Sequence, residues 1–177
     1  NLMTKTQTTL NGVDSIDLNG NNLNLVSLQN SGTANIYGFF AAVRLKFNNK
    51  FNWRTTTTLT KGFYNHSEDV VGHIPPFYGK STFTYKHRKI KLSLYTRFNG
   101  RKKWEEFSVL SDNPDQAIDG FGTPAWATIN ASWFIYLYSN LKIQAACENI
   151  LDAHYKTFAS GISAPGRNII TSLYFRF

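Results

Sequence analysis

The last eleven residues of the chain, Arg167-Asn-Ile-Ile-Thr-Ser-Leu-Tyr-Phe-Arg-Phe177, alternate between apolar and polar side chains. The apolar side chains Ile169, Leu173, Phe175 and Phe177 all fall on odd positions, and the even positions are mostly polar. This alternation predicts one β-strand, about as long as the roughly 9 to 11 residues of a tilted strand that crosses a membrane. A strand of a soluble sheet can alternate in the same way. Whether this strand belongs to a membrane protein therefore has to be decided from the rest of the chain.

The same period of two runs through most of the sequence, and no segment has a helical period. Strands are expected over 37–47, 51–63, 77–88, 90–99, 126–138, 141–148 and 167–177, with two weaker ones over 23–29 and before Asn11. The sequence therefore predicts an all-β protein of about eight or nine antiparallel strands.

The connections between these strands alternate between short and long. Tight turns are expected at 48–50, 87–89 and 138–140, and long loops at 64–76, 100–124 and 151–166. Counting back from Phe177, all tight turns fall at one end of the sheet and all long loops at the other. This arrangement is typical of outer-membrane barrels, which have short periplasmic turns and long external loops.

Composition is consistent with a barrel. The chain has 177 residues, of which 42% are hydrophobic and 15% aromatic, and its longest apolar runs are too short for a spanning helix. The single cysteine, Cys147, excludes an internal disulfide. The net charge of +8 comes from scattered Lys and Arg residues, which argues against nucleic-acid binding and suits contact with anionic lipid or lipopolysaccharide.

The two faces of the strands favour a membrane barrel over a soluble β-domain. The polar face is rich in Thr, Ser, Asn, Gln and Tyr, as a lumen lining would be. The apolar face carries aromatic residues near strand ends, where interfacial girdles lie: Phe47, Phe51, Phe63, Phe98, Trp133 and Phe177.

The C-terminal motifs resemble those of TonB-dependent outer-membrane receptors. In that family an Asn-hydrophobic-hydrophobic-Asp-x-x-Tyr segment precedes a Pro-Gly-Arg loop and a last strand that ends in Phe; here these are 149–155, 165–167 and Phe177. His73-Ile74-Pro75-Pro76 resembles the family's Ile-Pro-Pro entry to a strand, and 36–38 resembles a further strand motif, although Phe40 replaces its usual acidic residue.

The resemblance implies that residues 1–177 are the C-terminal portion of a single bacterial outer-membrane barrel domain of 22 strands. The N-terminal plug and the remaining strands are then missing from this sequence. Partners implied by the resemblance alone are the TonB complex and a surface lipoprotein. The expected function is import of a large, scarce solute of the siderophore, cobalamin, glycan or peptide class, without enzymatic activity and without a cofactor.

Candidate ligand-binding residues lie at the predicted outer mouth. Trp104, Phe107 and Phe121 belong to the longest loop and Trp126 lies beside it, while Arg97 is on the polar face. Exposed aromatic rings could stack on a sugar, a macrocycle or an aromatic siderophore, but they could equally pack the loop on itself. At the other end of the sheet, Leu173, Phe175 and Phe177 are the candidate signal for barrel assembly, by the same resemblance.

The sequence offers little support for a catalytic site or a metal site. The four histidines are far apart and form no metal-binding spacing. Asp112, Asp115 and Asp119 do not fit a calcium loop and are expected to be solvated loop charges. Ser132 and Ser172 face the expected lumen, but no strand histidine accompanies them. Two alternatives remain: a complete eight-stranded barrel, closed from Leu23 onward, with a structural or adhesive role, and an enzyme built on such a barrel.

Overall fold

The computed structural model describes residues 3–30, 33–65, 70–108, 112 and 117–177. The strands are β1 (Met3–Gln7), β2 (Ser15–Leu18), β3 (Asn21–Asn24), β4 (Val26–Asn30), β5 (Ala34–Lys46), β6 (Phe51–Tyr64), β7 (Tyr78–His87), β8 (Ile90–Asn99), β9 (Trp126–Tyr136), β10 (Leu141–Glu148) and β11 (Asn168–Phe175), with one 3₁₀ turn, η1 (Trp104–Glu106). The fold is all-β and antiparallel, as the alternation predicts. Within the described residues, no helix is long and apolar enough to cross a membrane.

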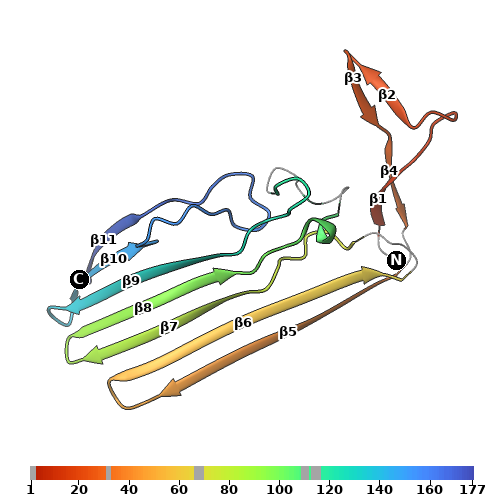
Figure 1. Ribbon diagram of the computed structural model, residues 1–177. Coiled ribbons are helices and arrows are strands. Elements are labelled where there is room, and N and C mark those ends of the chain that lie inside the picture. Colours follow the sequence, from red (N-terminus) through yellow and green to blue (C-terminus); the bar gives the residue numbers. More distant parts are fainter. Residues whose placement is uncertain (1–2, 31–32, 66–69, 109–111, 113–116) are drawn as a thin grey trace.

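Seven strands form one sheet in the order β11-β10-β9-β8-β7-β6-β5, so that each strand pairs with its neighbour in sequence. The tight turns β5–β6, β7–β8 and β9–β10 lie at the same end as the C-terminus, and the long connections lie at the opposite end (Figure 1). The predicted alternation of short and long connections is therefore confirmed. We call the two ends of the sheet the turn end and the loop end.

Register aligns the apolar side chains of all seven strands on one face. Leu45 pairs with Trp53, Trp53 with Phe83, and Phe83 with Leu94. Leu94 then pairs with Ala131, and the series continues through β10 to β11. Because side chains alternate across a strand, the opposite face collects the polar residues of every strand. We call these the apolar face and the polar face.

Burial on the two faces is inverted relative to a soluble sheet. On the apolar face, Phe39 is 64% exposed, Leu94 53% and Leu173 68%, whereas Thr128 and Asn130 on the polar face are only 2% and 3% exposed. A face with this many exposed large apolar side chains needs a partner other than water. The pattern is that of a barrel whose outer surface meets lipid.

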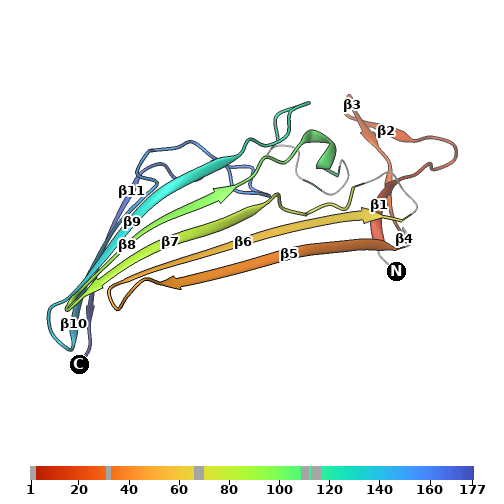
Figure 2. The ribbon, with the colours of Figure 1, turned by 60° about the horizontal axis from the view of Figure 1, so that its bottom comes forward.

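The sheet is strongly curved but does not close into a barrel (Figure 2). Strands β5 and β11 form its two edges, and the segment expected as a strand over 23–29 does not join it. The eight-stranded barrel closed from Leu23, which the sequence left open, is therefore wrong for this structure. The sheet instead presents the two free edges of a barrel segment.

The N-terminal residues form two small two-stranded sheets beyond the loop end (Figure 1). Strand β1 pairs with β4, and β2 pairs with β3. Asn19 and Gly20 join β2 to β3 with φ values of 57° and 83°, which is the conformation that a two-residue Asn-Gly hairpin requires. This turn signal was present in the sequence and accounts for the two additional short strands.

Aromatic side chains cluster at the turn end of the apolar face, as expected for an interfacial girdle. The Phe51 and Tyr85 rings are 4.7 Å apart between centroids, and the Phe51 and Phe83 rings 5.8 Å. The adjacent turn between β5 and β6 is stabilised by Asn48, whose side-chain oxygen accepts hydrogen bonds from the amides of Lys50 and Phe51.

Candidate functional site

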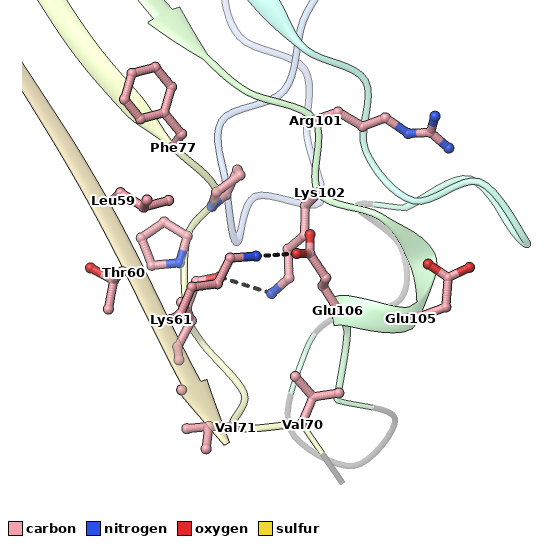
Figure 3. A pocket seen from close by; sticks show the side chains of 14 residues that line it. Leu59, Thr60, Lys61, Val70, Val71, Phe77, Arg101, Lys102, Glu105 and Glu106 are labelled. Atoms are coloured by element: carbon pink, nitrogen blue, oxygen red, sulfur yellow. Dashed lines mark hydrogen bonds and ion pairs between the residues drawn. The ribbon is translucent and has the colours of Figure 1, made fainter. Parts of the chain in front are cut away.

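A hollow of about 300 Å³ lies at the loop end, between the end of β6 and the long connections that follow β6 and β8 (Figure 3). Its apolar side is formed by Leu59, Val71 and Ile74, and its polar side by lysine and glutamate side chains. Gly62 forms part of its floor, where an added Cβ would lie 2.5 Å from Ile74 Cδ1. The absence of a side chain at Gly62 therefore lets the Ile-Pro-Pro segment approach β6.

Lys102 is the buried centre of the loop end, and its side chain is only 3% exposed. Its ammonium group donates to Asp112 Oδ2 at 3.1 Å and to the carbonyl of Ile74 at 2.9 Å. The same nitrogen lies 4.5 Å from the ring centre of Phe107 and 4.6 Å from that of Phe158. One side chain therefore connects residues of all three long loops.

Asp112 completes this cluster, which we call the Lys102–Asp112 clasp. Its carboxylate accepts hydrogen bonds from the amides of His73 and Ser108 as well as from Lys102. Burial lowers the pKa of Lys102, and the charge of Asp112 opposes that effect. The expectation that Asp112 is a solvated loop charge is therefore wrong, because its side chain is 1% exposed and paired. Asp115 lies outside the described residues, and Asp119 is exposed.

A second, more exposed ion pair joins β6 to η1. Lys61 donates to Glu106 (Figure 3). The other oxygen of the Glu106 carboxylate accepts a hydrogen bond from the amide of Lys103. Burial raises the pKa of Glu106, but the hydrogen bonds from Lys61 and Lys103 outweigh it and hold that pKa below its ordinary value. Both side chains remain partly solvated, so the pair is a modest contributor to stability.

The lowered pKa of Glu106 predicts that the loop end loosens in acid. A depressed carboxyl pKa contributes stability above the unfolded value of about 4.3, and this contribution is lost as pH falls through the folded pKa. Protease cleavage between residues 100 and 125 should therefore accelerate as the pH is lowered below about 4. Glu106→Gln should reduce this acid-dependent acceleration, and an identical acceleration in that variant would contradict the assignment.

The candidate ligand-binding residues do not form a single site. Trp104 and Phe107 contact each other with ring centres 6.3 Å apart, and Phe107 is largely buried against Lys102. Phe121 is 39% exposed and lies beneath the guanidinium of Arg101, at 3.8 Å from the ring centre. The Phe107 ring therefore packs within the loop end, which was the alternative to ligand contact.

Arg97 lies elsewhere, on the polar face near the loop end. It lines a hollow of about 250 Å³ together with Tyr78, Trp126 and Phe158. The ring centres of Trp126 and Tyr155 are 4.2 Å apart, with the ring planes tilted by 35°. An adjacent hollow of about 370 Å³ includes Trp126, Tyr155 and His154. Of the aromatic residues singled out from the sequence, Trp126 is therefore the one that borders open space together with Arg97.

The Asn-Ile-Leu-Asp segment holds the loop between β10 and β11 in place. Asn149 is 3% exposed, and its amide group donates to the carbonyls of Ala153 and Pro165 while its oxygen accepts from the amide of Ala153. Asp152 accepts from the amide of Arg167, whose side chain donates to the carbonyl of Ile150. The Asn-Ile-Leu-Asp and Pro-Gly-Arg segments are thus joined by hydrogen bonds, which gives both a structural role.

Asn149→Ala should destabilise this loop by about 1–3 kcal/mol, because it leaves buried backbone groups without partners. Asn149 also has a φ of 49°, a conformation that alanine adopts less readily than asparagine. The readout is the midpoint temperature of heat-induced mobility change in gels of the full-length protein. Asn168→Ala, an exposed position on β11, is the matched control and should leave the midpoint nearly unchanged.

Other groups that could carry chemistry remain dispersed. Ser132 lies opposite Ser93 and Ala146, and Ser172 lies opposite Gln144, so both are on the polar face as predicted. Within the described ranges, no three His, Cys, Asp or Glu side chains are grouped as metal ligands. Sequence reasoning missed the role of Lys102, because it lies in an ordinary basic run, Arg101 to Lys103, with no pattern that distinguishes it.

No protein-family model matches the sequence. No curated protein matches it either. Among solved structures, the chain resembles the copper transporter OprC, with a TM-score of 0.73 and 15% identity over 88% of this chain and 25% of that one.

It also resembles a variant of the ferric enterobactin receptor PfeA from Pseudomonas aeruginosa (TM-score 0.69, 17% identity, 100% of this chain and 27% of that one). The ferric yersiniabactin uptake receptor FyuA from Yersinia pestis matches at a TM-score of 0.56 and 16% identity, over 82% of this chain and 23% of that one. The chain spans about a quarter of the length of these structures. The likeness shows that its fold is that of a segment of a TonB-dependent receptor barrel.

Proposed function

We propose that this chain is the C-terminal part of the barrel of a TonB-dependent receptor that imports a large, scarce solute across a Gram-negative outer membrane. The observation that carries the proposal is the continuous apolar face of seven paired strands, with tight turns at one end and long loops at the other. Lipid and lipopolysaccharide would surround that face. The remaining strands and a plug would come from the rest of the protein, and TonB would supply energy.

The similar structures support a transport role and bear names of copper and ferric siderophore carriers. We infer the broader solute class of siderophore, cobalamin, glycan or peptide for this protein, and no catalytic activity. The hollow around Arg97, Tyr78 and Trp126 is the preferred contact site at the mouth, because it offers a cation beside exposed aromatic surface. Trp104, Phe107 and Phe121 would shape the loops around it, and Leu173, Phe175 and Phe177 would serve barrel assembly.

Transport is tested with the full-length protein in a host deleted for its own receptors. Four radiolabelled solutes are offered to the cells: ferric enterobactin, ferric yersiniabactin, copper and cobalamin. At least one of them should accumulate only when both this protein and TonB are present. The protein should fractionate with the outer membrane and show heat-modifiable gel migration. TonB-independent leakage of all four solutes, or fractionation with soluble protein, would overturn the proposal.

A second experiment addresses the alternative of a self-contained small barrel. Residues 1–177 alone should fail to refold in detergent and should aggregate, because edge strands β5 and β11 expose unpaired backbone groups. A monodisperse, heat-modifiable product from this segment would favour the alternative. Esterase turnover that is lost in Ser132→Ala would instead favour an enzyme.

A further inference from the structure

Acidic and basic residues are distributed differently along the chain. All eleven acidic residues fall in four segments, 14–17, 68–69, 105–119 and 148–152, and none of these segments contains a tight turn. Residues 34–64 and 78–99, which form β5 to β8 with their two tight turns, contain Lys and Arg but no Asp or Glu. The turn end of these four strands is therefore purely cationic.

Two neighbouring turns carry exposed cations at their tips. Lys50 lies in the β5–β6 turn, and Arg88 and Lys89 form the tip of the β7–β8 turn; all three are exposed. The two turns lie side by side (Figure 1), because the amide of Lys86 donates to the carbonyl of Lys50 at 2.7 Å. The ammonium group of Lys89 also donates to the carbonyl of Leu137 at 3.0 Å. We call Lys50, Arg88 and Lys89 the turn cations.

Aromatic rings of the apolar face lie directly beside the turn cations. Phe51 follows Lys50 in the chain, and His87 precedes Arg88. The Tyr85 ring lies between Phe51 and His87, with ring centres 4.7 and 6.3 Å away, and its plane is 16° from that of His87. Aromatic rings at the end of a lipid-facing surface mark the depth of the lipid headgroups. The turn cations, one residue farther along, are therefore at the depth of the headgroup phosphates.

The position of the turn cations differs from that of the cations on the polar face. Lys46, Lys86 and Lys91 face the interior of the barrel by alternation, where a plug can supply their counter-charges. The β7–β8 turn instead lies in the wall between the β5–β6 and β9–β10 turns, so closing the barrel adds no strand between them. The turn cations thus lie at the tips of hairpins whose outer side is next to the membrane.

We propose that the turn cations bind the headgroups of anionic phospholipids in the membrane leaflet at the turn end. Phosphate oxygens accept hydrogen bonds from ammonium and guanidinium groups alike. Each Lys or Arg near an anionic membrane surface strengthens the attraction about fivefold. The β9–β10 turn, residues 137–141, contains no charged side chain, so the preference is confined to the wall formed by β5 to β8.

This inference rests on the proposed function in one respect, since the apolar face must lie in a membrane. It adds a lipid class and a place on the barrel wall where that lipid binds. It requires neither TonB nor transport, and it does not depend on which solute is imported.

The test uses the full-length protein in phosphatidylcholine vesicles that contain a trace of photoactivatable lipid, either phosphatidylglycerol or phosphatidylcholine with the same acyl chains. Lipid-modified peptides are quantified by mass spectrometry after illumination. The ratio of phosphatidylglycerol to phosphatidylcholine crosslinks at 47–51 and 85–90 should exceed that at 137–141 by about fivefold or more. Lys50→Asn/Arg88→Asn should lower this ratio to that of the uncharged turn, and asparagine tolerates the φ of 48° at position 88.

The matched control is Lys46→Asn/Lys86→Asn, which removes the same charge from exposed residues of the polar face at the same end. It should leave the crosslink ratio nearly unchanged. An equal loss in this control, or equal ratios at all three turns of the parent protein, would overturn the proposal.

Two further outcomes separate this inference from the proposed function. Abundant but equal crosslinks from both lipids would overturn lipid selectivity and leave membrane insertion intact, whereas the absence of crosslinks from either lipid would overturn both. If Lys50→Asn/Arg88→Asn lowers the thermal midpoint without changing the crosslink ratio, the turn cations contact carboxylates of the protein itself, and the proposal is wrong.

Discussion

Replacing Asp112 by alanine should destabilise the packed loop end by about 3–5 kcal/mol, because it leaves the buried ammonium of Lys102 without its counter-charge. The substitution also removes the acceptor for the amides of His73 and Ser108. Since Lys102 holds the Ile74 carbonyl and contacts Phe107 and Phe158, the three long loops should loosen together. Hydrogen exchange of the full-length protein should show faster exchange in all three loops, with strands β5 to β11 unaffected.

Two variants make this expectation specific to a buried charge. The double substitution Lys102→Met/Asp112→Leu removes both charges and should recover the part of the lost protection that is due to the unpaired ammonium group. The amides of His73 and Ser108 still lack their acceptor in this variant, so recovery should be partial. Glu106→Gln breaks the exposed pair with Lys61 and should cost only about 0–1 kcal/mol. If Asp112→Ala behaves like Glu106→Gln, the Lys102–Asp112 clasp does not hold the loops.

The strand architecture could be predicted from the sequence because its signal is local and repeated. Period two assigns each side chain to a face, and the predicted apolar positions of β9 and β11 meet through β10 in the observed register. The tight turns add the strand order, since each connects neighbours. The prediction was weaker where the strands are short. The hairpin of β2 and β3 depends on the Asn19-Gly20 turn, which alternation does not reveal.

The loop end could not be predicted in the same way, because its contacts join residues far apart in the chain. Lys102 and Ile74 are separated by 28 positions, and Asn130 and Asn149 by 19. Neither contact follows from the spacing of residue types. The cations of the polar face are an intermediate case. The alternation places Arg44, Arg54 and Lys142 on one face, but only the register shows that Arg44 lies opposite Arg54.

Leu94→Arg should destabilise the barrel in a bilayer by about 2–4 kcal/mol, the range for a cation on the lipid face near the midplane. Leu94 lies midway along β8, is 53% exposed on the apolar face, and pairs with Phe83 and Ala131. The guanidinium group of the new arginine would lie in hydrocarbon without a hydrogen-bond or charge partner. The measurement is denaturant-dependent folding of the full-length protein into phospholipid vesicles.

Two further arginine substitutions separate membrane depth from sheet geometry. Ser93→Arg, one residue away on the polar face, should cost less, because the polar face of a membrane barrel does not meet hydrocarbon. Ile135→Arg lies on the apolar face but only one residue before the end of β9, so its cost should fall toward about 0–1 kcal/mol, as expected near the membrane interface. Equal costs for Leu94→Arg and Ser93→Arg would mean that the apolar face does not contact lipid. The cost of arginine on a lipid-facing surface depends on its depth in the membrane, whereas its cost in a protein interface does not. Equal costs for Ile135→Arg and Leu94→Arg would therefore mean that the apolar face is buried against protein.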